Sequence, residues 1–480
     1  MIEFDSHYVM TINGKAATND STQPAFNPAT KQEIAQVPDC SEAQLDTAVA
    51  ASRQAFKTWS ATPIAERQAM MVQLADLLEE HAEEFMALLT KEQGKPRAGA
   101  EWEIFGSALW LREIAKQTLP DENVEETDER KVVTRFTPLG VVGAIVPWNF
   151  PMLLAVWKIA PALAAGCTVV LKPSPYTPLC NLKFVELAQQ ILPPGVLNCV
   201  SGGNDLGRWM TAHPDINKIA FTGSTETGRH VYRSASETIK RLTLELGGND
   251  PAIVMPDVDA KAVAPQLFWA AFQNNAQFCN ATKRLYIHES VYDEVRDALI
   301  DFINQEIKVG DGADADTSLG PIQNSMQYEK VQNYFADCQN NGHAFALGGD
   351  IDTTAPGWFV PVTLVDNPPE DSRIVQEEPF GPILPLLKWS DEKDVIARAN
   401  DTIYGLGASV WGEDLEAVQR VGSQLEAGTV WLNEVHQYSP HQAFGGHKQS
   451  GLGCENSLHG LMEYTNWQTT TLNKTGVKSA

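Results

Sequence analysis

The stretch GVVGAIVPWNFPMLLAVWKIAPALAAGCTVVLKPS, residues 140–174, decides the fold. It holds two short apolar runs, at 140–146 and 167–173, on either side of a longer apolar segment at 153–166. Short apolar runs bounded by Gly and Pro are typical of strands buried on both faces, and the longer segment has the length of a helix. Strand, helix and strand at this spacing predict a βαβ unit and therefore a parallel sheet.

The same pattern continues along the chain. Further apolar runs follow at 195–202, 218–224 and 241–248, and a helical segment at 178–192 lies among them. In parallel α/β sheets, ligands bind beyond the carboxyl ends of the strands. The residues that directly follow the runs are therefore candidates for a site: Pro147–Pro151, Lys172–Ser174, Gly202, Gly223–Thr225 and Glu245–Gly248.

The flanking regions differ from this central sheet. Residues 41–117 are predicted to be helical, with a helix stop at Gly94 and Pro96. An acidic stretch then leads into a predicted strand at 132–136. A second alternating series, from about 251 to 445, predicts another α/β domain. It includes a long helix at 259–275, strands at 282–288 and 428–434, and a final strand at 464–472.

Composition bounds the function. A chain of 480 residues, 43% hydrophobic and 20% charged, predicts a globular protein of two or more domains. The net charge of −25 argues against nucleic acid and anionic membranes as partners. We expect no signal peptide in the N-terminal residues MIEFDSHYVM and no membrane span. The seven scattered cysteines include no C-x-x-C pair, so we expect no metal site, no disulfides and a cytoplasmic location.

Cys279 lies in an amide-rich run, AAFQNNAQFCNATKR, at 270–284. An arbitrary cysteine is most often buried and inert, and that is the alternative reading. A sulfur at a helix-to-strand turn among N–H groups is placed to act as a nucleophile whose oxyanion is stabilised. Cys279 is therefore a candidate nucleophile.

Two further residues suit such chemistry. Glu245 ends a predicted strand between apolar neighbours and two glycines, where a carboxylate can act as a general base. Asn149, in PWNFP, is rigidly held and can donate to an oxyanion. The alternatives are a solvated glutamate at a strand end and a plain turn.

Two features point to a phosphate-containing ligand. FTGSTETG, residues 221–228, follows a strand and opens a helix, whose N-terminus suits a phosphate. Lys172 follows another strand end and can bind a ribose or a phosphate, although a lysine there is otherwise a surface charge.

Seven motifs occur in a fixed order: PWNFP, KPS, FTGS, LELGG, Q-x-C, EEPFGP and FGG-x-K-x-SG. In this combination the chain, from about residue 27 to the terminal strand, resembles the aldehyde dehydrogenase superfamily. The resemblance implies that Cys279 attacks the aldehyde, while Asn149 and the backbone N–H of Cys279 hold the oxyanion. Hydride then passes to the nicotinamide, and water activated by Glu245 hydrolyses the thioester. Lys158 and Glu455 match a proton path of the family.

The resemblance also implies a cofactor site. Lys172, with Ser174 in the same turn, would meet the adenosine ribose, and Gly223 and Ser224 would face the pyrophosphate. Trp148 would lie nearby, Glu378 would hold the nicotinamide ribose, and Phe380 would pack beside it. Many NAD-specific relatives carry a glutamate where this chain has Pro175, so we expect NAD as cofactor with NADP tolerated. These assignments rest on the positions Trp148, Lys172, Ser174, Pro175, Gly223, Ser224, Glu378 and Phe380.

The substrate pocket of the family is mostly aromatic in this chain, which predicts an apolar or aromatic aldehyde. Succinic semialdehyde relatives carry an arginine at the position of Trp157, so a carboxylated substrate is not expected. Gln273 and His436 add polarity without an evident purpose. The implied lining residues are Phe150, Leu154, Trp157, Gln273, Phe278, Tyr438 and Phe444.

The implied fold is α/β, with a Rossmann-like cofactor-binding domain at 1–119 and 139–246 and an α/β catalytic domain at 247–445. A small β oligomerisation element at 120–138 and 460–480 implies a homodimer or homotetramer. Two alternatives stay open: a coenzyme A-acylating relative, which usually lacks the glutamate of LELGG, and a catalytically silent protein on the same fold. Glu245 weighs against the first, and Glu245 with Cys279 and Asn149 against the second.

Overall fold

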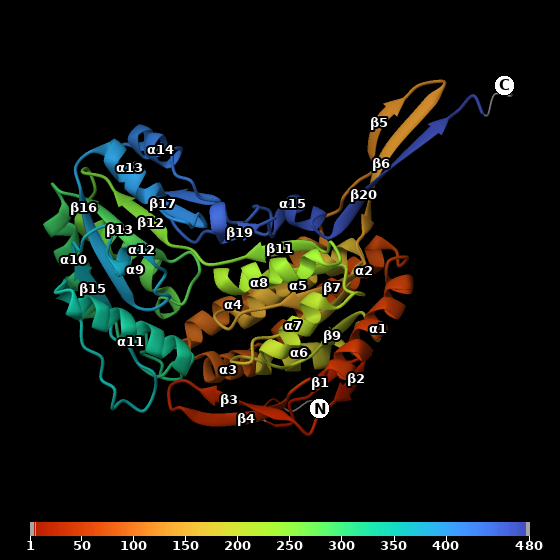
Figure 1. Cartoon of the computed structure of the whole chain (residues 1–480), viewed down its shortest axis with the longest axis horizontal. Helices are drawn as coiled ribbons and strands as arrows, with labels where there is room; N and C mark the ends of the chain where they lie inside the picture. Colours follow the sequence, from red (N-terminus) through yellow and green to blue (C-terminus); the bar gives the residue numbers. More distant parts are fainter. Residues whose placement is uncertain (1–3, 5, 477–480) are drawn as a thin grey trace.

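A computed structural model of the chain describes residue 4 and residues 6–476. Two α/β units lie side by side, and an arm of three strands projects from the body (Figure 1). The prediction of an α/β fold with a parallel central sheet is confirmed. The N-terminal segment, for which we expect no signal peptide, includes residues 1–3 and 5, which lie outside the described residues. Residues 477–480 of the predicted oligomerisation element also lie outside them.

The first sheet has eight strands, five of which form a parallel core in the order β9-β8-β7-β10-β11. Numbered along the chain, this order is 3-2-1-4-5, the doubly wound arrangement in which the strand order reverses beside the first strand. The strands are β1 (Met10–Ile12), β2 (Lys15–Ala17), β7 (Val141–Ile145), β8 (Thr168–Lys172), β9 (Leu197–Cys199), β10 (Lys218–Thr222), β11 (Arg241–Glu245) and β19 (Gly451–Leu452).

The central strand β7 is buried on both faces, which explains its continuous apolar run. Val142 and Ala144 pack in the hydrophobic cluster that contains the apolar residues of α5, whereas Val141 and Ile145 pack with α1 and α7 on the other face. A hairpin, β3 (Thr22–Asn27) and β4 (Gln32–Pro38), lies beside this unit. The helices are α1 (Glu42–Trp59), α2 (Ile64–Glu80), α3 (Ala82–Gln93), α4 (Arg97–Ala115), α5 (Pro151–Ala165), α6 (Leu179–Ala188), α7 (Asn204–Ala212) and α8 (Thr225–Ser236).

The second sheet has seven strands in the order β14-β15-β16-β13-β12-β17-β18. All neighbours pair in parallel except β14 and β15. The strands are β12 (Asp250–Val254), β13 (Thr282–His288), β14 (Ala344–Leu347), β15 (Thr363–Asp366), β16 (Ile383–Trp389), β17 (Gly407–Trp411) and β18 (Thr429–Leu432). The helices are α9 (Ala260–Phe272), α10 (Tyr292–Glu306), α11 (Ser325–Asn340), α12 (Arg373–Gln376), α13 (Glu392–Asn400) and α14 (Leu415–Gly422).

The chain passes from one sheet to the other between β11 and β12, and it returns when β19 pairs with β11. Short helical turns η1 (Gln273–Ala276) and η2 (Lys448–Ser450) and the helix α15 (Ser457–Met462) complete the fold. The division into a cofactor-binding and a catalytic domain stays a prediction, although the change of sheet falls where the sequence predicts the boundary.

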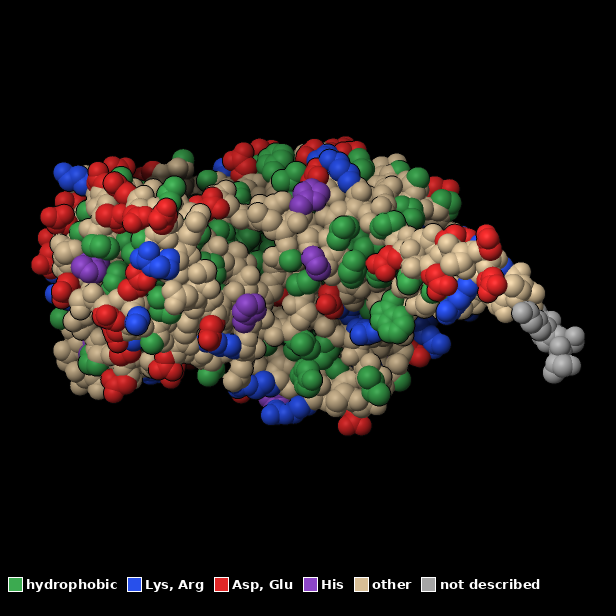
Figure 2. Space-filling view, turned by 90° about the horizontal axis from the view of Figure 1, so that it is seen from above, with side chains coloured by type: hydrophobic (Ala, Val, Ile, Leu, Met, Phe, Trp, Pro, Cys, Tyr) green, Lys and Arg blue, Asp and Glu red, His purple; other side chains and the backbone are tan. Residues whose placement is uncertain are grey.

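The arm consists of β5 (Glu122–Glu126), β6 (Arg130–Pro138) and β20 (Thr465–Asn473) (Figure 1). It also projects from the body in the space-filling view (Figure 2). The predicted strand at 132–136 lies inside β6, but the acidic stretch before it also forms a strand. Ion pairs help to hold this acidic strand, since Glu126 contacts Lys131 at 3.0 Å across the hairpin. The arm exposes large apolar side chains, among them Trp467 at 71% and Val124 at 63%.

One predicted boundary is wrong in a way that bears on the site. The helix predicted at 259–275 ends at Phe272, because Asn274, Asn275 and Ala276 adopt left-handed backbone angles, with φ of 53°, 57° and 58°. Asparagine tolerates this region better than most residues. Within the described residues, no helix is both long and apolar enough to cross a membrane.

Candidate active site

The loop that carries Cys279 connects α9 to β13 and begins with the left-handed turn. Its amide side chains fasten the loop to the backbone around it. Asn275 Nδ2 donates to Gly320 O at 2.9 Å, and Gln277 Nε2 donates to Pro321 O at 3.2 Å. The amide-rich run therefore anchors the nucleophile loop. That the amide-rich run also stabilises the oxyanion formed at the sulfur stays a prediction.

The PWNFP loop after β7 is attached to this same segment. Asn149 Nδ2 donates to Gln277 O at 3.0 Å, and Asn274 Nδ2 donates to Asn149 O at 3.0 Å. The rings of Phe150 and Phe278 lie 4.7 Å apart. Asn149 and the Cys279 loop are thus joined across the two sheets, and the second N–H of the Asn149 amide stays available as a donor.

Glu245 ends β11 with its side chain 4% exposed. Among the described residues, neither of its carboxyl oxygens has a hydrogen-bond partner. Burial therefore raises its pKa well above the usual value; the charge of Glu455 raises it further, and Lys158 opposes the shift. A buried carboxyl without hydrogen-bond partners binds a proton more tightly than an exposed one, which suits a group that takes a proton from water.

Lys158 on α5 and Glu455 form a buried ion pair behind Glu245. Lys158 Nζ lies 2.6 Å from Glu455 Oε1 and 2.7 Å from Thr222 Oγ1. Glu455 Oε2 has no partner among the described residues. The sequence predicted a proton path through these two residues. Their pairing fits this path, which stays a prediction.

Cys279 is half-buried, and its sulfur lies 3.8 Å from Asn280 Oδ1. Burial raises the pKa of the thiol to about 12, and the charges of Asp250, Glu245 and Glu378 act in the same direction. The charge of Lys283 acts in the opposite direction. The thiol is therefore neutral at pH 7 in the free protein, so its activation needs a base or additional positive charge.

An aromatic cluster surrounds the cysteine. The ring centroid of Phe444 lies 5.4 Å from that of Trp157 and 5.9 Å from that of Tyr438. Leu154, Cys279 and Tyr438 pack against the same hydrophobic cluster. The predicted pocket residues Phe150, Leu154, Trp157, Phe278, Tyr438 and Phe444 therefore lie together. Gln273 lies half-buried at the end of α9, and its place in the pocket stays a prediction.

The polarity of His436 has a structural explanation that the sequence did not provide. His436 Nε2 lies 3.0 Å from Asn280 O, and the ring packs against Phe278 at 4.6 Å. Burial lowers the pKa of His436 to about 4, so the ring is neutral at pH 7. Asn280 Nδ2 also donates to the Tyr438 hydroxyl at 2.6 Å. These contacts hold the residue that follows Cys279.

The predicted cofactor residues lie at the carboxyl edge of the first sheet, beside the point where its strand order reverses. Lys172 ends β8 almost fully buried, which lowers its pKa to about 8, and its recorded hydrogen bond goes to the neighbouring Pro173 O at 3.3 Å. Gly223 follows β10 where an added Cβ would lie 2.5 Å from the Phe221 ring. Ser224 is the exposed N-cap of α8, and it accepts a hydrogen bond from Thr227 N at 3.2 Å.

The loop between α12 and β16 of the second unit carries the remaining predicted cofactor residues, Glu378 and Phe380. Glu378 Oε1 accepts a hydrogen bond from Gly248 N at 3.1 Å, and the rings of Trp148 and Phe380 meet edge to face at 5.4 Å. A buried lysine with spare donors, a glycine turn at a helix N-terminus and the carboxylate of Glu378 fit a dinucleotide. Ser174 fits less directly, because its hydroxyl accepts a hydrogen bond from Tyr176 N at 3.3 Å and holds the turn.

The sequence profile of the aldehyde dehydrogenase family matches residues 15–470. The chain belongs to the aldehyde dehydrogenase family. The phenylacetaldehyde dehydrogenase of Pseudomonas fluorescens is 40% identical over 472 residues, covering 95% of this chain and 94% of that protein. The aldehyde dehydrogenase LUC3 of a Fusarium species is 39% identical, covering 94% and 96% of the two chains. An NAD+ complex of the aldehyde dehydrogenase from Bacillus cereus superimposes with a TM-score of 0.95 at 36% identity, covering 98% and 97%.

These matches confirm the predicted family, fold and activity class, an oxidoreductase that oxidises aldehydes to acids. The roles of single residues in this aldehyde dehydrogenase stay predictions. The sequence interpretation missed several residues that hold the site. Lys95 Nζ contacts Glu103 Oε2 at 2.5 Å and Asn149 O at 2.9 Å, and Glu103 Oε1 accepts from Met152 N at 2.8 Å.

Glu103 therefore caps the N-terminus of α5, the helix that carries Trp157 and Lys158. Its position on a predicted helix gave no sign of this role, because the contact spans two elements far apart in the chain. Lys283, four residues after Cys279, was missed because its local sequence does not show that its ammonium is buried against Glu378.

Proposed function

We propose that this aldehyde dehydrogenase oxidises an apolar, aromatic aldehyde to the carboxylic acid with NAD+ as the hydride acceptor. The observation that carries the proposal is the juxtaposition of Cys279, the partnerless carboxyl of Glu245 and the aromatic cluster. The phenylacetaldehyde dehydrogenase among its relatives and the NAD+ complexes among similar structures support it.

The proposed chemistry begins at the sulfur. The Cys279 thiolate attacks the carbonyl carbon of the aldehyde and forms a thiohemiacetal, whose oxyanion Asn149 stabilises through its free N–H. When bound, the cofactor supplies the nicotinamide ring that accepts the hydride and leaves a thioester on Cys279. Glu245 removes a proton from water, which attacks the thioester and releases the acid and the thiolate. Lys158 and Glu455 lie where the proton taken by Glu245 can be relayed.

The residues that would hold the cofactor are those at the carboxyl edge of the first sheet, together with Glu378 from the loop after α12. Lys172 would bind the adenosine ribose, Gly223 and Ser224 the pyrophosphate, and Glu378 the nicotinamide ribose. Pro175 is half-buried beside Lys172 and brings no carboxylate to the ribose, so NADP is tolerated beside NAD.

The aromatic cluster also suits a quaternary ammonium group through cation–π attraction, and betaine aldehyde dehydrogenases are among the relatives, including a chloroplast protein of Beta vulgaris that is 38% identical. A matched pair of substrates separates the two possibilities. Betaine aldehyde and 3,3-dimethylbutanal have nearly the same shape, but only the first is charged.

We expect kcat/KM to be highest for phenylacetaldehyde and higher for 3,3-dimethylbutanal than for betaine aldehyde, with NADH formation followed by its absorbance. A clear preference for betaine aldehyde would overturn the aromatic substrate. Rapid oxidation only when coenzyme A is added would identify the acylating alternative, and no oxidation of any aldehyde would identify a silent protein.

The oligomeric state belongs to the same proposal. The arm is built from the two segments that the sequence assigns to oligomerisation, and it exposes Trp467, Val124 and Leu472. A projecting sheet with exposed apolar side chains suits burial against a second copy of the chain. We propose a homodimer or homotetramer, measurable by light scattering, in a cytoplasmic setting that suits seven unpaired cysteines.

A further inference from the structure

Lys283 is a buried lysine that the proposed chemistry does not use. It is the second residue of β13, and its side chain is 3% exposed. Lysine is almost never fully buried unless its charge is paired, because desolvation of an ammonium costs several kcal/mol. The groups around its Nζ therefore indicate what it does.

The ammonium contacts the nucleophile loop and one carboxylate. Lys283 Nζ lies 2.5 Å from Cys279 O, 3.1 Å from Phe278 O and 3.4 Å from Ala281 O. It also lies 3.3 Å from Glu378 Oε1. One side chain thus gathers the carbonyls on both sides of the nucleophile and connects them to Glu378.

The same network includes the backbone of the LELGG motif. Glu378 Oε1 accepts a hydrogen bond from Gly248 N, and an added Cβ at Gly248 would lie 2.6 Å from Cys279 O. This close approach leaves the carbonyl of Cys279 little room to move. Lys283 therefore lies where the nucleophile loop, the carboxylate of Glu378 and the start of the catalytic sheet meet.

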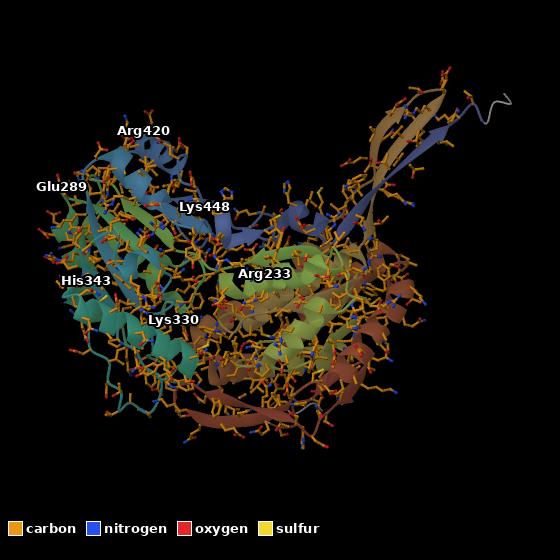
Figure 3. The ribbon with its side chains drawn as sticks, in the orientation of Figure 1. Arg233, Glu289, Lys330, His343, Arg420 and Lys448 are labelled. Carbon is orange, nitrogen blue, oxygen red and sulfur yellow. The ribbon has the colours of Figure 1, made fainter. Side chains whose placement is uncertain are left out.

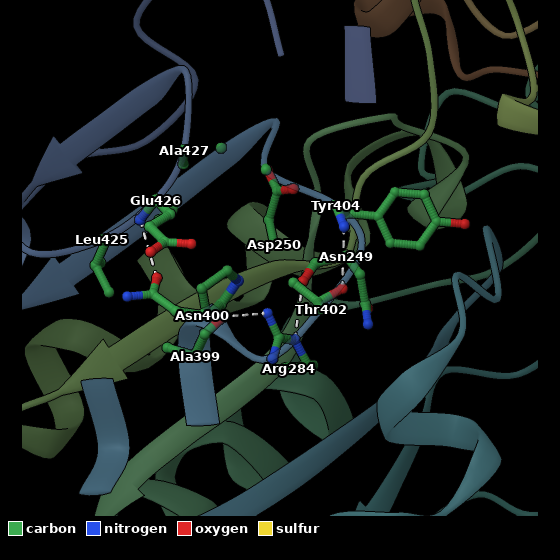
Figure 4. A pocket seen from close by; sticks show the side chains of 14 residues that line it. Asn249, Asp250, Arg284, Ala399, Asn400, Thr402, Tyr404, Leu425, Glu426 and Ala427 are labelled. Carbon is green, nitrogen blue, oxygen red and sulfur yellow. Dashed lines mark hydrogen bonds between the residues drawn. The ribbon is translucent and has the colours of Figure 1, made fainter. Parts of the chain in front are cut away.

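The neighbouring residue has a different environment. Successive side chains of a strand point to opposite faces. Arg284 donates to Asn249 O at 2.9 Å and to Ala399 O at 2.8 Å, away from Cys279, in the small cavity shown in Figure 4. Arg284 thus holds the sheet ends together, while Lys283 faces the site.

We propose that Lys283 is a positioning residue that fixes the Cys279 loop, places positive charge beside the sulfur and connects it to Glu378. The inference rests on the proposed function, in which Cys279 is the nucleophile and Glu378 holds the cofactor ribose. Removal of the ammonium should therefore affect thiol reactivity and cofactor binding together.

The charged groups that face Cys279 give the direction of the effect. Glu245 of β11, Asp250 of β12 and Glu378 of the loop after α12 all disfavour the thiolate, and Lys283 of β13 favours it. The hydroxyl of Tyr438 also faces the site, with its pKa raised by burial, so it stays neutral. Without Lys283, the effect of the three carboxyl groups on the pKa of the thiol would be larger.

The test uses the full chain and the alkylation of Cys279 by iodoacetamide, located by mass spectrometry, so that no turnover is needed. In Lys283→Met we expect the alkylation rate at pH 8 to fall about tenfold, with the rate–pH curve displaced to higher pH by about one unit. We also expect the Kd for NAD+ to rise about tenfold, because Glu378 loses its partner. Lys283→Arg should restore most of both quantities.

Lys330 provides a matched control (Figure 3). Its Nζ donates to the backbone oxygen of Glu378 at 2.8 Å. Lys330 is thus a lysine that contacts Glu378 from a different element and through its backbone. Lys330→Met should leave the rate–pH curve of alkylation at its wild-type position. Lys283→Gln keeps a hydrogen-bond donor without the charge, so it should shift the rate–pH curve as Lys283→Met does. It replaces Lys283→Met in the test if the methionine variant does not fold.

A folded Lys283→Met or Lys283→Gln with the wild-type rate–pH curve and NAD+ affinity would overturn the inference. An equal shift in Lys330→Met would overturn it too, since the effect would then be general. Failure of the proposed function looks different: wild-type protein would oxidise no aldehyde, or alkylation of Cys279 would leave its turnover intact.

Discussion

Two buried carboxyl groups, Glu103 and Glu245, show how differently this aldehyde dehydrogenase treats the same functional group. Both side chains are at most 4% exposed. Glu103 is paired with Lys95 and accepts hydrogen bonds from Met152 N and Leu153 N at the start of α5. Glu245 has no hydrogen-bond partner among the described residues.

The difference separates structure from chemistry. A carboxylate with an ammonium and two N–H donors is compensated for the water it has lost, and it holds α4, α5 and the PWNFP loop in place. A carboxyl without partners is costly to ionise, so it binds a proton more tightly than an ordinary carboxyl does. The fold satisfies the group that positions the site and leaves unsatisfied the group that would react.

The largest effect is expected where both carboxyl groups are intact and the nucleophile is lost. Cys279→Ser should lower aldehyde oxidation by more than about a thousandfold, because an alcohol is a much weaker nucleophile than a thiolate. NAD+ affinity, measured by calorimetry, should stay within about twofold of wild type. Cys338→Ala, a buried cysteine of α11, serves as the control, and near-normal turnover of Cys279→Ser would disprove the mechanism.

The compensated carboxylate is tested by removing its partner. Lys95→Met leaves the Glu103 charge buried with fewer donors, so the free energy of unfolding should fall by about 3–5 kcal/mol, seen as a lower melting temperature. Arg97 begins α4, the helix that carries Glu103, and forms an exposed ion pair with Glu83 of α3. Arg97→Met should therefore leave the melting temperature unchanged. Equal melting temperatures of Lys95→Met and wild type would mean that Glu103 does not depend on this pair.

Glu245, the carboxyl without hydrogen-bond partners among the described residues, is tested by replacing it with glutamine, which is always neutral. Glu245→Gln should slow steady turnover about a hundredfold through loss of the base, while hydride transfer continues. Rapid mixing should then show a burst of NADH equal to the number of active sites. A variant that gives no burst would place Glu245 in an earlier step.

A further test adds a carboxylate beside Lys172, where the chain has Pro175. Pro175→Glu would add an acceptor beside the buried Lys172 and repel a 2′-phosphate. We expect the ratio of kcat/KM for NAD to that for NADP to rise about tenfold, which corresponds to about 1.4 kcal/mol. Both should be measured at one ionic strength, because salt screens the repulsion. An unchanged ratio would show that Pro175 does not face the ribose.

The smallest effect is the pH dependence of stability. The pKa of Glu245 in the folded chain is raised above its unfolded value, so the folded state binds the extra proton between the two values. Stability from this group is therefore present at low pH and is lost as pH rises through the folded pKa. Since glutamine does not titrate, the melting temperature of Glu245→Gln should gain on wild type as pH rises above the ordinary carboxyl pKa of 4.5. A constant difference would contradict the raised pKa.

Much of the fold could be predicted because its elements have local causes. The apolar run at 141–145 is continuous because β7 is covered on both faces, and Gly94 ends α3 because its φ of 92° suits glycine. The acidic strand β5 was missed, since its composition disfavours a strand and only pairing with β6 stabilises it. The end of α9 was placed too late, because the left-handed turn depends on amide contacts with Gly320 and Pro321.

The sequence by itself determined the strand spacing of the parallel sheet and the motifs that carry Asn149, Glu245 and Cys279. Asn149 and Glu245 lie where buried strands end, so the pattern puts them at the carboxyl edge of a sheet, whereas Cys279 lies in the turn between α9 and β13. Only the tertiary structure decided which buried charges are compensated. Lys95, Glu103 and Lys283 have no local pattern that distinguishes them from surface charges. Their partners Asn149, Met152 and Glu378 lie on other segments, and electrostatic pairing in the interior depends on distances that packing alone sets.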